Sequence, residues 1–323
     1  MPSLKEIKNR IASVKSTRKI TSAMKMVASS KLHHAQVAIQ NMLPYENLLE
    51  HILKSFLVSM PEVNSKLAAR HANARSVALL VYSSNSSLCG GFNANVIREM
   101  LKAIDEYRQQ GIDDITVYPI GRKVAEKVAK LDVKCGGDFV ELADKPNAAK
   151  CAEISRELMK KYVDGSLDRV DLIYHHFKSA GSQILLRRQF LPIDLSLESI
   201  GGLNDRDLSS NMVTAKAQEY LRKKKQREKQ QDNDVVPLND DFIVEPDLYT
   251  VLSSLIPKLL NLMVYTALLD SVASEHAARM VAMQTATDNA DELLRDLNLQ
   301  FNKSRQSAIT NELLDIVAGS ANN

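Results

Sequence analysis

Residues 259–318 read LLNLMVYTALLDSVASEHAARMVAMQTATDNADELLRDLNLQFNKSRQSAITNELLDIVA, a stretch that contains neither Gly nor Pro. With Lys258 it makes 61 residues free of the two strongest helix breakers. At a rise of about 1.5 Å per residue, a helix of that length spans about 90 Å, three times the width of a small domain. Such a helix needs a partner surface along its length. Its expected buried positions are Leu259, Met263, Leu268, Val272, Met280, Met283, Leu293, Leu297, Phe301, Ile309, Leu313 and Ile316.

The N-terminal segment has the pattern expected of that partner. Its first apolar residues follow the 3–4–3 spacing of a coiled coil. These residues are Leu4, Ile7, Ile11 and Val14. The stripe is then expected to continue with a shifted phase through Ile20, Met24, Val27 and Leu32. We predict a helix that extends to about residue 58 and ends near Pro61.

Charge supports pairing between the two ends of the chain. Residues 1–40 contain eight Lys or Arg and one Glu, net +7, whereas residues 247–323 contain nine acidic and five basic residues, net −4. Opposite charge favours association of the two helices. Because the chain leaves and returns through its middle part, the pair is expected to be antiparallel. The C-terminal helix is longer, so part of it should project beyond its partner or meet other chains.

The middle of the chain reads as an α/β domain. Short β-rich runs alternate with helical stretches, which is typical of a partly parallel sheet. The expected strands are 76–84, 114–121, 168–177 and 182–192, and the expected helices are 93–109, 122–130 and 147–163. The sequence therefore predicts an α/β fold in which a Rossmann-like domain is inserted into a long antiparallel coiled coil.

Four segments follow from these patterns. They are a shaft helix over 1–60, an α/β foot domain over 75–200, a charged insertion or linker over 203–246 and a second shaft helix over 247–323. Within the insertion, residues 216–234 are dense in charge and nearly free of apolar anchors, so we expect them at the surface, helical or disordered, and outside the core.

Other classes of site receive little support from composition. Cys89, Cys135 and Cys151 lack the spacing of a zinc site or a disulfide framework, and the neighbouring pair His175–His176 points to opposite faces of a strand. No uninterrupted apolar run reaches the about 20 residues of a membrane span. The amphipathic, basic start continues past Met24, which argues against a removable leader. We expect no catalytic, cofactor-binding or metal-binding residues.

Four separated stretches, in order, resemble the γ subunits of F-type ATP synthases of the bacterial type. They are IKNRIASVKSTRKITSAMKMVASSKLHHAQ (7–36), SSLCGGFNANV (86–96), ASEHAARMVAMQTATDNADELL (273–294) and NKSRQSAITNELLDIVAG (302–319). The resemblance implies a central rotor stalk that turns inside a ring of α and β subunits. It implies that the foot binds the ε subunit and the membrane c-ring. Ion flow through that ring would drive ATP synthesis at the β subunits.

The resemblance also implies a set of non-catalytic contact residues and a location. Contacts with the β subunits are implied for Arg305, Gln306, Thr310, Arg279, Met24 and Lys25. The protein would lie at the inner cell membrane, peripheral and on the cytoplasmic side. One departure concerns Asn85, Ser86 and Ser87, which stand where the family usually has two charged residues and a Gly. An ion pair made by that loop is therefore in doubt.

Two alternatives remain open from the residues. The basic N-terminal helix could belong to a coiled-coil nucleic-acid-binding protein, although it lacks aromatic residues for base stacking. An α/β enzyme with helical arms would need convergent acid, base or phosphate-binding groups within residues 75–200. No such group is evident in the sequence.

Overall fold

The computed structural model describes residues 3–59, 65–69, 71, 75–196, 206 and 244–321. The chain forms two compact units. The first comprises residues 1–29 and 279–323, and the second comprises residues 30–278. Two long helices, α1 (Leu4–Ser59) and α8 (Leu248–Ala321), each contribute to both units. The predicted long helices are therefore confirmed, with α1 ending one residue beyond the expected position.

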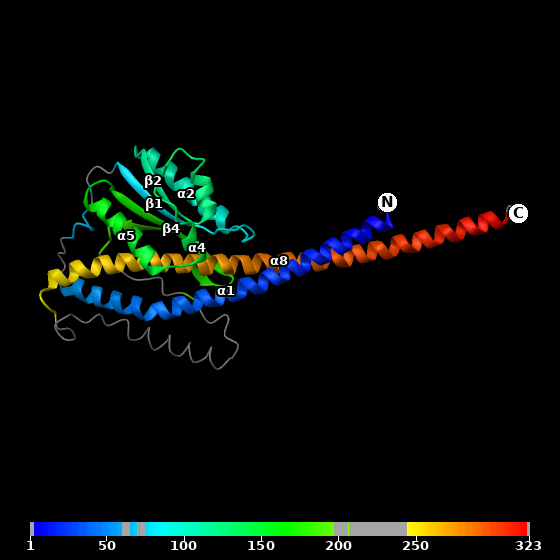
Figure 1. Cartoon of the computed structure of the whole chain (residues 1–323), viewed down its shortest axis with the longest axis horizontal. Coiled ribbons are helices and arrows are strands. Elements are labelled where there is room, and N and C mark those ends of the chain that lie inside the picture. Colours follow the sequence, from blue (N-terminus) through cyan, green and yellow to red (C-terminus); the bar gives the residue numbers. More distant parts are fainter. Residues whose placement is uncertain are drawn as a thin grey trace. The chain divides into compact units, whose positions relative to one another are not determined.

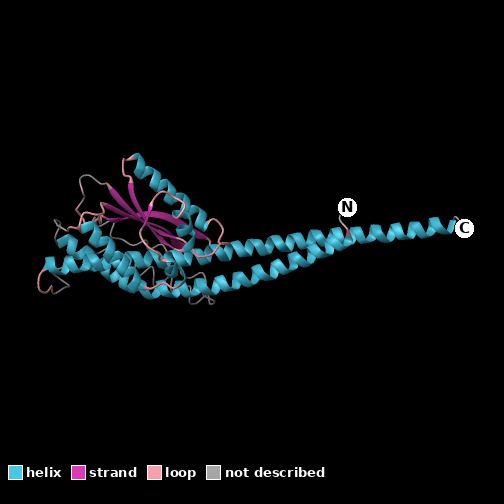
Figure 2. Cartoon of the chain, turned by 45° about the horizontal axis from the view of Figure 1, so that its top comes forward, coloured by secondary structure: helices cyan, strands magenta, loops and turns pink. Residues whose placement is uncertain are grey.

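In the first unit the two helices run antiparallel. Arg18 of α1 pairs with Asp291 of α8. Thr21 lies three residues after Arg18 on α1, and its partner Thr287 lies four residues before Asp291 on α8. Figures 1 and 2 show these parts of α1 and α8 side by side, with the C-terminal end of α8 extending past the N-terminus of the chain. This arrangement agrees with the expected antiparallel pair and with the expected projection of α8.

The buried stripe of α1 in this unit differs from the expected one. Its seam positions follow one 3–4 spacing that is interrupted only at exposed Arg18: Leu4, Ile7, Ile11, Val14, Thr21, Lys25 and Ala28, with Ser22 and Ser29 beside them also half-buried. Consequently Ile20 and Val27 are 58% and 56% exposed. The predicted burial of Ile20, Met24 and Val27 is wrong, whereas Leu32 is buried as predicted. Polar residues occupy seam positions, which an apolar pattern alone cannot identify.

The corresponding stripe of α8 follows the same spacing. Its members are Met283, Thr287, Ala290, Leu294, Leu297, Phe301, Ser304 and Ala308. Four residues expected to be buried are instead exposed: Leu293, Ile309, Leu313 and Ile316. Leu293 precedes the seam position Leu294, and the other three lie on the last turns of α8. The part of α8 after Ala308 thus has no apolar cover within the described residues.

The second unit contains a five-stranded sheet with the order β3-β2-β1-β4-β5. β1 is parallel to both β2 and β4, β2 is parallel to β3, and β5 is antiparallel to β4. The strands are β1 (Ser76–Tyr82), β2 (Asp114–Ile120), β3 (Lys134–Cys135), β4 (Arg169–Ser179) and β5 (Ser182–Leu191). The shorter helices are α2 (Phe92–Gln109), α3 (Arg122–Val128), α4 (Val140–Asp144) and α5 (Ala148–Val163).

Helices cover both faces of this sheet (Figure 2). On one face, α2 and α3 pack against Val77, Leu79 and Val81 of β1. On the other face, Ala78, Leu80 and Tyr82 join a larger core made with α5 and with the parts of α1 and α8 in this unit. Successive residues of β1 point to opposite faces of the sheet, so this buried strand contributes side chains to two separate cores. The Rossmann-like α/β domain predicted from the sequence is confirmed.

Several details were not predicted. Strand β3 and helix α4 are too short for a periodicity signal. Residues 216–234, expected at the surface, lie outside the described residues. Arg206, which precedes that stretch in the charged insertion, is only 6% exposed, and its burial was not predicted. Within Leu248–Leu314, one stretch of 18 residues is apolar enough, and its helix long enough, to cross a membrane by length and composition alone. Of that stretch, 44% is buried inside the protein. Core residues of α8 such as Leu260 and Val264 account for part of that apolar character.

Candidate functional site

The seam between α1 and α8 in the first unit has a polar layer. The hydroxyl oxygens of Thr21 and Thr287 lie 2.8 Å apart, and Arg18 Nε lies 2.5 Å from Asp291 Oδ1. Both side chains of the ion pair remain more than two-fifths exposed. Exposed ion pairs contribute little to stability, so this layer fixes the register of the helices more than it binds them together.

Three of the six contact residues implied by the sequence lie in one zone of this unit. Met24 is 39% exposed, while its neighbour Lys25 occupies a half-buried seam position. The antiparallel register places them opposite the turn of α8 around Met283, and half-buried Arg279 lies one turn before it. The structure therefore brings Met24, Lys25 and Arg279 near one another.

The other three implied residues form a second zone on α8. Arg305, Gln306 and Thr310 are exposed. The Thr310 hydroxyl donates to the backbone oxygen of Gln306, 2.9 Å away. Within the described part of the chain, the side chains of Arg305 and Gln306 make no hydrogen bond or ion pair. A guanidinium and an amide one residue apart are therefore available to acceptors on another protein.

The two zones are far apart along one helix. From Met283 to Arg305 there are 22 residues, so the zones are separated by about 33 Å along α8. Neither zone has a nucleophile paired with a base or a cluster of metal-ligating groups among the described residues.

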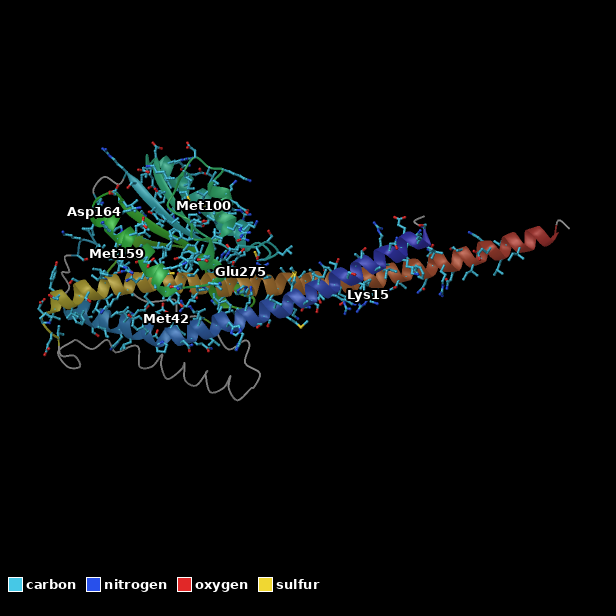
Figure 3. All side chains as sticks on the ribbon, in the orientation of Figure 1. Lys15, Met42, Met100, Met159, Asp164 and Glu275 are labelled. Carbon is cyan, nitrogen blue, oxygen red and sulfur yellow. The ribbon has the colours of Figure 1, made fainter. Side chains whose placement is uncertain are left out.

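The sequence reasoning missed an apolar strip on α1 beside the first zone. Ile20, Met24 and Val27 follow helical spacing and all are exposed, and Met26 is 66% exposed. Exposed apolar strips of this kind mark interaction sites. If the initial 3–4 spacing is continued through polar residues, it predicts that Ile20, Met24 and Val27 face outward. Lys15, which Figure 3 labels on α1, is likewise exposed.

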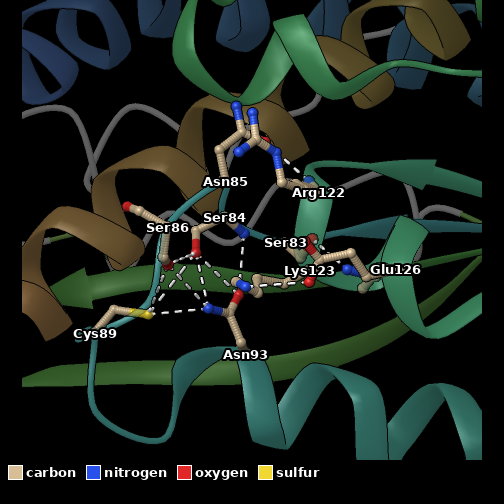
Figure 4. A network of polar contacts seen from close by, with 10 residues as sticks. Ser83, Ser84, Asn85, Ser86, Cys89, Asn93, Arg122, Lys123 and Glu126 are labelled. Carbon is tan, nitrogen blue, oxygen red and sulfur yellow. Dashed lines mark hydrogen bonds and ion pairs between the residues drawn. The ribbon is translucent and has the colours of Figure 1, made fainter.

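The α/β part of the second unit has one position that corresponds to the usual ligand site of this class of fold. In doubly wound sheets, ligands bind where the strand order reverses, at the carboxyl ends of the central strands. Here that position is the end of β1, where the chain turns into α2 (Figure 4). Asn93 Nδ2 donates to Ser84 Oγ at 2.8 Å and to Cys89 Sγ at 3.1 Å, and Ser84 Oγ donates to the Ser86 oxygen at 2.7 Å.

The polar groups at this crevice are thus engaged with each other. Ser83 Oγ also accepts from the backbone nitrogen of Val124 at the start of α3. Such a closed network holds the strand-to-helix turn and leaves these groups no free donor set for a phosphate or carbonyl. The α/β enzyme alternative therefore finds no support at the place where this fold would hold a substrate.

Asn85 accounts for the departure from the family pattern in this loop. Its amide nitrogen donates to the Val140 oxygen at 2.9 Å and to Asp144 Oδ2 at 2.6 Å, and its oxygen accepts from the Arg122 nitrogen. A carboxylate at this position could not donate and would be repelled by Asp144. The neutral amide of Asn85 therefore fits the contact with α4, whereas Ser86 and Ser87 are exposed.

His175, a buried histidine of β4, has a strongly lowered pKa. His175 is 4% exposed and stacks on Phe92 with ring centroids 4.4 Å apart. Burial lowers the pKa of His175 to about 4. The neighbouring His176 faces Asp270 instead, with Nδ1 2.8 Å from Oδ2. The two rings point to different partners, as expected for adjacent residues of a strand.

The chain is similar to known proteins over nearly its whole length. The ATP synthase family model matches residues 3–322. The ATP synthase gamma chain of Phocaeicola vulgatus is 50% identical over 320 residues, which cover 99% of both chains. That of Bacteroides thetaiotaomicron is 50% identical over 323 residues, again 99% of both. That of Christiangramia forsetii is 36% identical over 99% of this chain and 98% of its own.

Solved structures agree in fold. A chain of the Euglena gracilis mitochondrial ATP synthase, in a structure of OSCP, F1 and c-ring in rotational state 3, matches with a TM-score of 0.59 and 17% identity. The match covers 98% of this chain and 93% of the other. None of these relatives supports the nucleic-acid-binding alternative. Full-length matches at up to 50% identity, together with the paired helices and the inserted sheet, show that the chain belongs to the ATP synthase gamma chain family.

Proposed function

We propose that this chain is the central rotor stalk of an F-type ATP synthase. The observation that carries the proposal is the second contact zone, Arg305 and Gln306, which lies exposed on α8 without a partner inside the described chain. The family membership supports the same role. In this proposal the paired helices turn inside a ring of α and β subunits and impose nucleotide-dependent states on the β subunits in turn.

The partners are assigned by segment. Residues 1–60 and 247–323 supply the shaft inside the ring, and residues 75–200 supply the foot, which binds the ε subunit and the c-ring. Residues 203–246 form a charged insertion. The chain is then a non-catalytic, peripheral subunit on the cytoplasmic side of the inner membrane. The ATP-forming chemistry belongs to the β subunits.

The two contact zones have different chemistry and hence different roles. Arg305 and Gln306 present donors that suit carboxylates and carbonyls on a β-subunit loop, and Thr310 lies one turn further on. Met24, with the apolar strip around it, suits a sliding contact, because apolar contacts are non-directional. Lys25 and Arg279, half-buried beside the seam, place positive charge at the edge of that contact.

Transmission of force sets a physical requirement on the shaft. One charge that crosses 100 mV supplies about 2.3 kcal/mol, so several ions must be combined for each ATP. The shaft must carry that energy without local unfolding. Two long helices joined along a heptad seam meet this requirement better than loops, because nearly all of their interior backbone groups are hydrogen-bonded within the helix, with Pro44 and Pro257 as the interruptions.

The test is a double substitution in the second zone. Arg305→Ala with Gln306→Ala is expected to lower ATP-driven ion pumping and ATP synthesis at least severalfold in membrane vesicles, while the isolated chain keeps its helical content. The matched control is Gln300→Ala with Lys303→Ala, which removes the same charge and amide from exposed positions on the same helix. Coupled synthesis at the wild-type rate in the Arg305/Gln306 variant would refute the assignment.

A further inference from the structure

A buried cluster of charged side chains lies in the second unit, away from both contact zones. Arg206 donates through Nε and Nη2 to the two oxygens of Asp270 at 2.9 and 3.0 Å. Its Nη1 donates to Glu46 Oε2 at 3.4 Å, and His176 lies against the same Asp270. The side chains of Arg206, Asp270 and His176 are 6%, 1% and 1% exposed, and that of Glu46 is 10% exposed.

The members of this cluster come from separate parts of the fold. Glu46 belongs to α1, Asp270 to α8 and His176 to β4. Arg206 lies in the charged insertion and is the one residue described between Ser196 and Val244. A single guanidinium therefore joins the two long helices directly, and through Asp270 it joins them to the sheet.

The chemistry of the cluster is directional. A guanidinium that forms two parallel hydrogen bonds with a carboxylate fixes distance and orientation together. Burial raises the pKa of Glu46, and the charge of Arg206 opposes that rise. The surrounding contacts of α1 and α8, by contrast, are apolar side chains such as Leu49, Leu53 and Leu260. Apolar burial holds surfaces together but sets no preferred direction along them.

Packing at this position also leaves room for movement. A cavity of about 170 Å³ adjoins the cluster between α1, α8, β4 and β5. Glu46, Tyr174, Arg188 and Arg206 are among its lining residues. A close-packed interface resists sliding, and a cavity removes part of that resistance. The polar cluster therefore adds a directional constraint to the apolar packing of α1 and α8 beside this cavity.

We propose that Arg206 is a positioning residue that locks α1, α8 and β4 together, so that a twist applied to the α/β domain passes into both long helices without slip. This inference rests on the proposed rotor function. It concerns coupling and not nucleotide chemistry. Without the contacts of Arg206, the ring still hydrolyses ATP, but fewer ions are pumped for each ATP hydrolysed.

The experiment compares variants in the complete ATP synthase in inverted membrane vesicles. The ratio of ATP-driven ion pumping to ATP hydrolysis is measured in the same preparation. The main variant is Arg206→Met with Glu46→Gln and Asp270→Asn, which removes the three charges together and so leaves no unpaired buried ion. We expect hydrolysis within about twofold of wild type and a severalfold lower ratio. A wild-type ratio in this assembled variant overturns the proposal.

A second variant covers the case in which the triple substitution does not assemble. Arg206→Lys keeps the charge and loses the bidentate geometry, and we expect an intermediate ratio. A wild-type ratio with Arg206→Lys would then overturn the proposal. If pumping by the wild-type complex does not depend on this chain at all, the rotor function itself fails, and that result is distinct from either outcome above.

The matched control is Arg187, a second arginine held by a buried carboxylate in the same unit. Arg187 Nε donates to Asp171 Oδ2 at 2.9 Å, and its Nη1 donates to Glu106 Oε2. These residues join β4, β5 and α2 and do not involve α1 or α8. Arg187→Lys is expected to lower the melting temperature of the chain with an unchanged pumping ratio. A ratio lowered equally by Arg187→Lys and Arg206→Lys would show a general loss of structure and overturn the proposal.

Discussion

The same two helices are held in different ways in the two units. In the second unit, α8 buries Leu260 and Val264 completely, in a core shared with α1, α5 and the sheet. In the first unit the seam is a single line of residues with Thr and charged members, and Arg18 and Asp291 remain largely exposed. One part carries its own core, whereas the other relies on a narrow seam.

This difference shows how one helix can serve two purposes. A helix buried on several sides keeps a defined place in a domain because many apolar contacts must be lost together. A helix with one narrow seam leaves most of its surface for partners. The exposed residues of the first unit, including Ile20, Met24 and Leu313, are then available to a surrounding ring.

The largest expected contrast is in amide hydrogen exchange along α8. Exchange should be slowest over 248–278, faster over 279–308 and fastest after Ala308, with roughly tenfold or more between successive segments, because local opening is easier where fewer apolar contacts are lost. Peptide-resolved mass spectrometry of the isolated full chain measures this. Equal protection from residue 248 to residue 308 would contradict the comparison.

Substitution of a buried leucine should lower the free energy of unfolding more in the second unit than in the first. Leu53→Ala removes a fully buried side chain from the second unit and is expected to lower the free energy of unfolding by about 3 kcal/mol. Leu297→Ala in the seam should cost about 1 kcal/mol, because two helices can close around the smaller side chain. All nine tyrosines lie within residues 30–278, so tyrosine fluorescence follows the second unit alone, and circular dichroism follows both. Equal losses would show that the seam is packed like the core.

The stability of the second unit should fall in mild acid through His175. Its pKa is lowered to about 4 by burial, whereas an unfolded histidine titrates near 6.5. Below that value the unfolded chain binds a proton that the folded chain excludes, so stability decreases as pH falls from about 6.5 towards 4. Between about pH 7.5 and 5 the loss is about 2 kcal/mol.

Urea unfolding followed by tyrosine fluorescence measures this pH dependence. His175→Phe keeps an aromatic ring against Phe92 and removes the titration, so its stability should depend less steeply on pH by about that amount. The raised pKa of Glu46 acts in the opposite sense, because protonation of Glu46 favours the folded state. Glu46 is present in both the wild type and the His175→Phe variant, so the difference between their pH profiles reports the titration of His175 alone. Parallel pH profiles would reject the assignment.

The smallest effect is expected for the ion pair of the seam. Arg18→Ala should lower stability by less than about 1 kcal/mol, because both side chains of the pair are exposed. The loss should shrink between about 0.1 and 1 M salt as the charges are screened. Thermal melts followed by circular dichroism measure it, with Lys15→Ala on the same helix as the control. A loss of several kcal/mol would mean that the polar layer, and not the apolar seam, holds the first unit together.

The contact zones were predictable to different degrees. Arg305, Gln306 and Thr310 came from a motif, and the structure adds that they are exposed. Whether Lys25 faces outward could not be read from the motif, because seam membership depends on the residue opposite. The closed network around Ser84 and the role of Asn85 also required the structure, since their partners are distant in sequence or backbone atoms.

The sequence by itself determined the two long helices, the alternation of strands and helices between them and the antiparallel pairing. These follow from local periodicity, from the absence of Gly and Pro and from the order of segments along the chain. Tertiary structure alone decided which face of α1 is buried, because Thr21 and Arg18 become seam residues only when Thr287 and Asp291 lie opposite them. It also decided that one arginine of a charge-rich segment is buried. A polar side chain belongs inside only where a partner on another element satisfies it, and that partner is a property of the fold.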